Sequence, residues 1–204
     1  MKIWYLKIPI ELFQKGKEIG ITNTNTILVY CLILNNHFQF NLMTWKNETI
    51  AKFLNLNEKQ VKRALTELKQ NNWIRVSNNI ELNNTKVKRD IQPIYSTLKY
   101  SHVYKPKDND GFKIQYITLQ IEALKLFGKL DFEYDKSLLL WSRLDNIQST
   151  PYLNKYTIAK CAEEFSVSLI TCKRCFKELQ EKNWLQKQNG KWITTDIFTL
   201  YGYN

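Results

Sequence analysis

Glycine and proline, the residues that most often interrupt regular structure, are scarce in this sequence. Its 204 residues include 6 glycines and 4 prolines, and this low content argues against long disordered stretches. Apolar residues make up 44 % of the chain, and 6 Trp, 11 Tyr and 10 Phe provide bulk for hydrophobic cores. We therefore expect a folded protein, either one large domain or two small ones.

Long apolar runs are missing as well. No stretch approaches the ~18 consecutive apolar residues of a membrane span, and Lys2 and Lys7 interrupt the start too early for a signal peptide. The four cysteines are then expected to be reduced thiols. The sequence predicts a cytoplasmic protein with no membrane partner.

Acidic residues are outnumbered by basic ones. The chain has 19 Asp and Glu against 30 Lys and Arg, which gives a net charge of +11. Residues 1–107 contain 17 basic and 7 acidic residues, whereas residues 108–204 contain 13 and 12. A positive balance of this size favours a polyanionic partner, of which nucleic acid is the commonest, and the first half carries nearly all of it.

Catalytic motifs are also lacking. The sequence has no phosphate-binding glycine loop, no HExxH and no nucleophile elbow. Asp131, Glu133 and Asp135 alternate just before a predicted helix, where charges that favour the helix start are a simpler interpretation than a metal site. We expect no enzyme activity, no cofactor and no metal.

Three blocks of the first half recur in the same order in the second half. They are IWYLKIPIELF (3–13) with IQYITLQIEAL (114–124), TIAK (49–52) with TIAK (157–160), and VKRALTELKQNNWI (61–74) with CKRCFKELQEKNWL (172–185). The offset is 111 for the outer blocks and 108 for the middle one, which predicts a three-residue insertion between the second and third helices of the second copy. We infer an internal duplication, with domains 1–107 and 108–204 separated near the polar stretch KPKDNDG (105–111).

The first copy has a coarse secondary-structure pattern. Its elements are a strand over 2–8, helices over 22–36, 48–54 and 57–72, a strand from Trp73, and a second strand-like run with Lys86, Lys88 and Arg89. Asn57 and Gln60 have the spacing of a capping box. Helices followed by a β-hairpin are the winged-helix arrangement.

The second copy repeats this order. Helices are predicted over 135–148, 157–165 and 168–182, the last one capped by Ser168, and Asn189-Gly190 is a strong signal for a tight hairpin turn. The predicted fold class is α+β, mainly helical, with two tandem winged helix-turn-helix domains.

The stretch TIAKFLNLNEKQVKRALTELKQNNWI (49–74) resembles a bacterial winged helix-turn-helix. Its small residue in the second helix, polar turn and Trp-Ile strand entry are most similar to the versions in plasmid and phage replication proteins and in regulators of mobile elements. Residues 157–185 share the pattern with a longer turn. The resemblance implies sequence-specific binding of double-stranded DNA, with the third helix of a copy in the major groove.

Helix 57–72 has one apolar face, made by Val61, Ala64, Leu65 and Leu68. Its other face and the hairpin provide the candidate DNA contacts of the first copy: Asn57, Lys59, Gln60, Lys62, Arg63, Thr66, Gln70, Lys86, Lys88 and Arg89. Arg63 can form a paired contact with guanine, and Gln60 or Gln70 can form one with adenine. Lys59 and Lys62 are expected to contact phosphates, and the hairpin cations to contact the DNA backbone or the minor groove.

The equivalent helix of the second copy has a less basic face. Its candidate contacts are Thr171, Lys173, Arg174 and Lys177, with Lys187 and Lys191 in the hairpin. Ile170 stands where the first copy has Lys59, and Glu181 where it has Gln70. This copy is interpreted as an auxiliary DNA reader or as a dimerisation domain.

Cys172-x-x-Cys175, with Cys161 nearby, could suggest zinc. The repeat places all three at core positions, aligned with Phe53, Val61 and Ala64, and both histidines lie in the other half. Buried free thiols are therefore the expected state.

The sequence leaves several functions open. The first hypothesis is a regulator or replication initiator of a mobile element, which binds double-stranded DNA and recruits host replication or transcription proteins, alone or as a homodimer through the second domain. An adaptor between proteins is the alternative. RNA binding is less favoured, because the sequence has no aromatic stacking motif.

Overall fold

The computed structural model describes residues 5–40, 43–82, 85–94, 116–148, 153 and 156–202. Within these ranges the fold is α+β, with helices predominant and short antiparallel hairpins beside them. The chain divides into two compact units, an N-terminal unit of Leu6–Lys105 and a C-terminal unit of Pro106–Asn204 together with Met1–Tyr5. No helix in the described ranges has the length and apolar character needed to cross a membrane.

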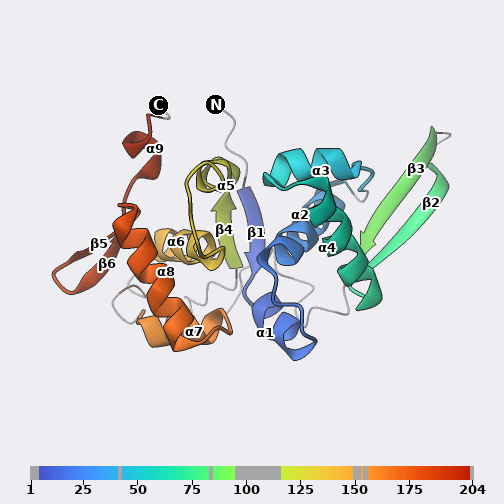
Figure 1. Ribbon diagram of the computed structural model, residues 1–204. Helices are drawn as coiled ribbons and strands as arrows, with labels where there is room; N and C mark the ends of the chain where they lie inside the picture. Colours follow the sequence, from blue (N-terminus) through green and yellow to red (C-terminus); the bar gives the residue numbers. More distant parts are fainter. Residues whose placement is uncertain are drawn as a thin grey trace. The chain divides into compact units, whose positions relative to one another are not determined.

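The N-terminal unit contains helices followed by a hairpin, as the first half of the sequence predicts (Figure 1). The elements are β1 (Tyr5–Pro9), α1 (Glu11–Glu18), α2 (Thr24–Phe40), α3 (Asn47–Leu54), α4 (Glu58–Gln70), β2 (Ile74–Leu82) and β3 (Thr85–Pro93). The predicted helices are confirmed, although α2 extends beyond the predicted end. Helix α1 was not predicted, because its eight residues are too few for their periodicity to be diagnostic.

The core of the N-terminal unit is built around α2. Asn23 begins this helix, because its Oδ1 accepts a hydrogen bond from the Asn25 N–H at 2.8 Å. Residues 27–34 are then buried without interruption, so α2 lies in the centre of the unit and packs against α4 and β3. Its tyrosine Tyr30 contacts Trp73 at the entry to the hairpin, with the ring centroids 5.0 Å apart.

The turn between α3 and α4 is short and well defined. Asn55 ends α3 in the left-handed region, with φ 53°, a conformation that asparagine tolerates better than most residues. The Leu56 N–H then bonds to the Ala51 carbonyl at 2.9 Å. This closure turns the chain sharply and places α4 against α3.

The C-terminal unit contains the same order of elements (Figure 1). They are β4 (Tyr116–Gln120), α5 (Ile121–Phe127), α6 (Lys136–Ile147), α7 (Ile158–Glu164), α8 (Leu169–Glu181), β5 (Leu185–Gln188), β6 (Lys191–Thr194) and α9 (Ile197–Leu200). The helices predicted in this half are confirmed as α6, α7 and α8, and α5 and α9 are additional. Asn189 and Gly190, with φ 50° and 79°, form the predicted tight turn between β5 and β6.

Candidate nucleic-acid interface

Helix α4 is fixed in the N-terminal unit by its apolar face and by one partly buried hydrogen bond to α2. Val61, Ala64 and Leu68 are buried, whereas Leu65 is only half-buried. On the same helix, Glu67 Oε2 accepts a hydrogen bond at 2.6 Å from the hydroxyl of Thr26 in α2. This link fixes the rotation of α4, and therefore which residues it presents to solvent.

The exposed face of α4 is basic. Lys59, Lys62, Arg63, Thr66 and Gln70 are all exposed. In the described part of the chain, no ion pair engages the three cations of this group. The exposed face that the sequence predicts is therefore present, and the contacts of its residues with DNA stay a prediction.

The first turn of α4 is held by a capping box. Asn57 Oδ1 accepts from the Gln60 N–H at 2.9 Å, and Gln60 Oε1 accepts from the Asn57 N–H at 2.8 Å. A paired contact to adenine needs the Gln60 carbonyl oxygen as acceptor, and the capping box already uses it. Asn57 and Gln60 therefore shape the helix start, and their expected contacts with DNA stay predictions.

The hairpin β2–β3 follows α4 directly. It is antiparallel, with Ile74 opposite Pro93 and Glu81 opposite Lys86. The side chains of Lys86 and Lys88 lie outside the described part of the structure. Their expected role in DNA binding therefore stays a prediction.

Arg89 has a structural role in the N-terminal unit. Its Nη1 donates to Asn47 Oδ1 at 2.8 Å and its Nη2 donates to the carbonyl oxygen of Trp45. Burial lowers the pKa of the guanidinium. Arg89 holds the segment before α3 against the hairpin, and its expected contact with DNA stays a prediction.

Helix α8 is the counterpart of α4 in the C-terminal unit. Cys172, Cys175, Phe176 and Leu179 are buried, and burial raises the pKa of Cys175 to about 11. Ser168 caps the helix, since its Oγ accepts from the Thr171 N–H at 3.0 Å. The expected core face of α8 is thus confirmed.

The exposed cations of α8 have carboxylates close by. Lys173, Arg174 and Lys177 are exposed, but Lys177 pairs with Glu181 at 3.5 Å. A cleft of about 610 Å³ is lined by charges of both signs: Asp131, Glu133, Arg174, Lys177, Glu178, Glu181 and Lys182, with Tyr134. The nearby carboxylates weaken the positive field at this helix, in contrast to α4.

The short hairpin β5–β6 carries the remaining candidates. Lys187 and Lys191 are exposed. The ammonium group of Lys187 lies 5.4 Å from the centroid of the Trp192 ring, directly across the hairpin. A cation–π contact of this kind positions Lys187 beside the hairpin without neutralising its charge.

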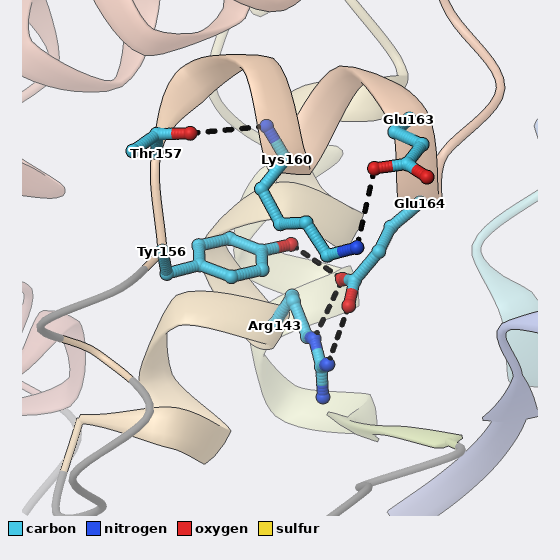
Figure 2. Close-up of polar contacts among 6 residues, drawn as sticks. All are labelled: Arg143, Tyr156, Thr157, Lys160, Glu163 and Glu164. Carbon is cyan, nitrogen blue, oxygen red and sulfur yellow. Dashed lines mark hydrogen bonds and ion pairs between the residues drawn. The ribbon is translucent and has the colours of Figure 1, made fainter.

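A buried ion pair fixes α7 to α6 (Figure 2). Arg143 of α6, whose side chain is 2 % exposed, donates to both carboxylate oxygens of Glu164, at 2.8 and 3.0 Å, and the Tyr156 hydroxyl donates to the same carboxylate at 2.6 Å. Burial alone would lower the pKa of Arg143, but the Glu164 carboxylate raises it. Thr157 caps α7 beside this group, and Lys160 pairs with Glu163 on the exposed side.

The two units place comparable residues at positions that differ by 111. Thr26–Glu67 in the N-terminal unit corresponds to Ser137–Glu178 in the C-terminal unit, and both pairs are hydrogen-bonded between helices. Sequence reasoning missed all four of these residues. The equal spacing of a hydroxyl and a glutamate in the two halves was the signal that could have found them.

The structure contradicts the three-residue insertion expected in the C-terminal unit. Thr157, aligned with Thr49 by the TIAK match, is the N-cap of α7, whereas Thr49 lies inside α3. The buried residues show the actual correspondence: Ile50, Ala51 and Leu54 match Cys161, Ala162 and Phe165 at the offset of 111. Ser166 in the C-terminal unit repeats the left-handed turn of Asn55, with φ 51°. The turns have equal length, and Cys161 occupies the place of Ile50 instead of Phe53.

Comparison with known proteins finds one similarity, in the N-terminal helices. A family model described as "Helix-turn-helix domain" matches residues 23–74, which span α2, α3, α4 and the start of β2. No curated protein and no solved structure matches this chain. The family match supports DNA as the partner of this segment.

Proposed function

We propose that this chain is a sequence-specific, double-stranded-DNA-binding protein of a plasmid or phage, which acts as a transcriptional regulator or replication initiator. The observation that carries the proposal is the exposed basic face of α4, within a helix-turn-helix whose other face is fixed to α2. In such domains the exposed side of the third helix enters the major groove. Arg63 then contacts guanine, Gln70 contacts adenine, and Lys59 and Lys62 contact phosphates.

The proposal includes a second winged helix-turn-helix in the C-terminal unit, related to the first by duplication. Its support is the common order of elements and the recurrence of core and turn residues at an offset of 111. Because carboxylates surround its cations, this unit is an auxiliary DNA reader or a dimerisation domain. The hairpin β2–β3 is the wing of the principal reader.

The proposed protein performs no chemistry of its own. It assembles on repeated DNA sites and recruits host replication or transcription proteins. If both units bind DNA, one chain can occupy two successive major grooves, about one helical turn apart. If only the first unit binds DNA and the second dimerises, the dimer matches an inverted repeat instead.

Selection of bound duplexes from a random pool tests this function. We expect the full chain to enrich one sequence, as direct repeats if both units read DNA or as an inverted repeat if the second unit dimerises. Affinity should fall steeply with salt, by roughly 10³-fold or more between 50 and 200 mM if six or more phosphates are contacted. Absence of an enriched sequence, or affinity that salt does not change, would refute the proposal.

A protein–protein adaptor is the second candidate. The cleft beside α8 favours it, because its lining carries charges of both signs and can pair with a protein surface of mixed charge. The same experiment separates the two, because an adaptor binds duplexes weakly and without sequence preference.

A further inference from the structure

The start of α8 exposes two adjacent apolar side chains. Leu169 is 44 % exposed and Ile170 is 64 % exposed, so Ile170 is the most exposed large apolar residue in the described part of the chain. The corresponding positions of α4 carry Glu58 and Lys59. At the site where α4 presents charge, α8 therefore presents an aliphatic group.

This apolar group lies at the end of a basic stripe. Lys173, Arg174 and Lys177 follow Ile170 by three, four and seven residues, which places them on the same side of the helix. All three are exposed, and Lys177 pairs with Glu181 on the same helix. The exposed surface of α8 is therefore aliphatic at its first turn and positively charged beyond it. A partner that fits this surface has negative charges at its edges and one apolar group between them.

The major groove of DNA has this character. Phosphates border the groove, and the apolar group on its floor is the 5-methyl group of thymine. Among the described residues neither Lys173 nor Arg174 forms an ion pair, so a purely apolar protein partner would leave both charges unpaired. Charge complementarity therefore favours DNA as the occupant of this surface.

The beginning of α8 is also held in a defined position. The hydroxyl groups of Ser168 and Thr171 lie 2.8 Å apart, and Ser168 Oγ accepts from the Thr171 N–H. Ile170 lies between these residues in the first turn. A β-branched side chain on a capped turn has few rotamers to lose on binding.

We infer that Ile170 is a specificity-determining residue that recognises the 5-methyl group of a thymine in the half of the DNA site bound by the C-terminal unit. This inference rests on the proposed function, and it assigns to the second unit an apolar mode of recognition where the first uses hydrogen-bonding side chains. Arg174 and Lys173 anchor the adjacent phosphates.

Replacement of thymine by deoxyuridine tests the inference, because deoxyuridine lacks only the methyl group. The full chain is titrated with the selected duplex and with duplexes that carry deoxyuridine at single positions. We expect one position at which the loss of the methyl group weakens binding about fourfold, as for one methylene-sized apolar group removed from a contact. Ile170→Ala should bind both versions of that duplex equally.

A matched control is Leu200→Ala, which removes an exposed leucine of the same unit, on α9 (46 % exposed). This variant should retain the difference between thymine and deoxyuridine. The inference is overturned if the parent protein binds all deoxyuridine duplexes as tightly as the thymine duplex, or if Ile170→Ala retains the difference. It is also overturned if Ile170→Ala leaves DNA binding unchanged but lowers the molecular mass measured by sedimentation. That result would show that the surface binds a second copy of the chain.

These outcomes differ from failure of the proposed function. If the full chain binds no duplex with sequence preference, the proposed function itself fails. If binding is specific but indifferent to every thymine methyl group, only the role of Ile170 fails.

Discussion

The hydroxyl of Thr26 donates a hydrogen bond to the carboxylate of Glu67, at 2.6 Å, and thereby joins α2 to the helix that carries the basic face. Thr26 is 2 % exposed and Glu67 is half-buried, so the bond is partly shielded from water. Ser137 and Glu178 form the same link in the C-terminal unit.

Substitution Thr26→Val should destabilise the N-terminal unit. Valine keeps the shape of threonine but removes the donor to Glu67. We expect the free energy of unfolding to fall by about 1.5–3 kcal/mol, the range for a hydrogen bond to a charged group. Urea titration measures this loss, and Thr66→Val is the control, because the exposed Thr66 hydroxyl bonds only to the Lys62 carbonyl of its own helix. Equal effects of the two substitutions would contradict the prediction.

Substitution Arg63→Ala should weaken DNA binding and relax preference at one base pair, by about 1–3 kcal/mol. The reason is the loss of a paired contact to guanine. Arg174→Ala should cost less, since carboxylates already weaken the field around Arg174. Fluorescence anisotropy with the selected duplex and its single-base variants measures both. If Arg63→Ala changes neither affinity nor preference, α4 does not enter the groove.

Substitution Arg89→Ala should lower the free energy of unfolding. Its guanidinium connects the hairpin to Trp45 and Asn47, and a lost hydrogen bond to a charged group costs about 1.5–3 kcal/mol. Thermal unfolding should shift to lower temperature, whereas the dependence of DNA affinity on salt should stay the same. A residue that contacted phosphate would show the opposite pattern, with a salt slope smaller by about one and unchanged stability.

Substitutions of Arg143 and Glu164 should have strongly non-additive effects on the free energy of unfolding. Arg143→Leu alone leaves a buried carboxylate and should cost about 3–5 kcal/mol, as should Glu164→Phe alone. The double variant should recover most of this loss, because Leu32 and Phe53 occupy the corresponding positions of the N-terminal unit, where Phe53 packs against Trp45 at 5.3 Å between ring centroids. Unfolding of the full double-mutant cycle in urea measures the coupling, and additive losses would argue against it.

The four cysteines should resist thiol reagents in the native protein. Cys31, Cys161, Cys172 and Cys175 are all buried, and burial raises the pKa of Cys31, of Cys161 and of Cys175. The reactive thiolate of these three residues is therefore scarce at pH 8, and all four thiols are inaccessible. Reaction with a chromogenic disulfide should be slow in buffer and fast in denaturant. Rapid reaction of any thiol in the folded protein would contradict its placement in the core.

The helix-turn-helix could be predicted because its signals are local. Asn57 and Gln60 specify the start of α4 by their spacing, and Asn189-Gly190 specifies the second hairpin. The apolar positions of α4 and α8 repeat at helical spacing, so their buried faces followed from the sequence as well.

Interactions between distant residues could not be predicted in this way. The TIAK match favoured a shifted alignment of α7, and only the burial of Cys161, Ala162 and Phe165 identified the correct one. Four identical residues dominate an alignment made by sequence alone. The position of a helix depends instead on which side chains pack in the core.

The sequence by itself determined the type and order of the main helices, the basic excess of the first half and the less basic face of α8, since each depends on composition or on spacing along the chain. The tertiary structure decided which polar residues are available. In the folded chain Arg89 bonds to Trp45 and Asn47, and Gln60 bonds within the cap of α4. Arg63 and Ile170 remain exposed. A polar side chain can form only a few hydrogen bonds, and the residues that folding brings beside it decide which of them form.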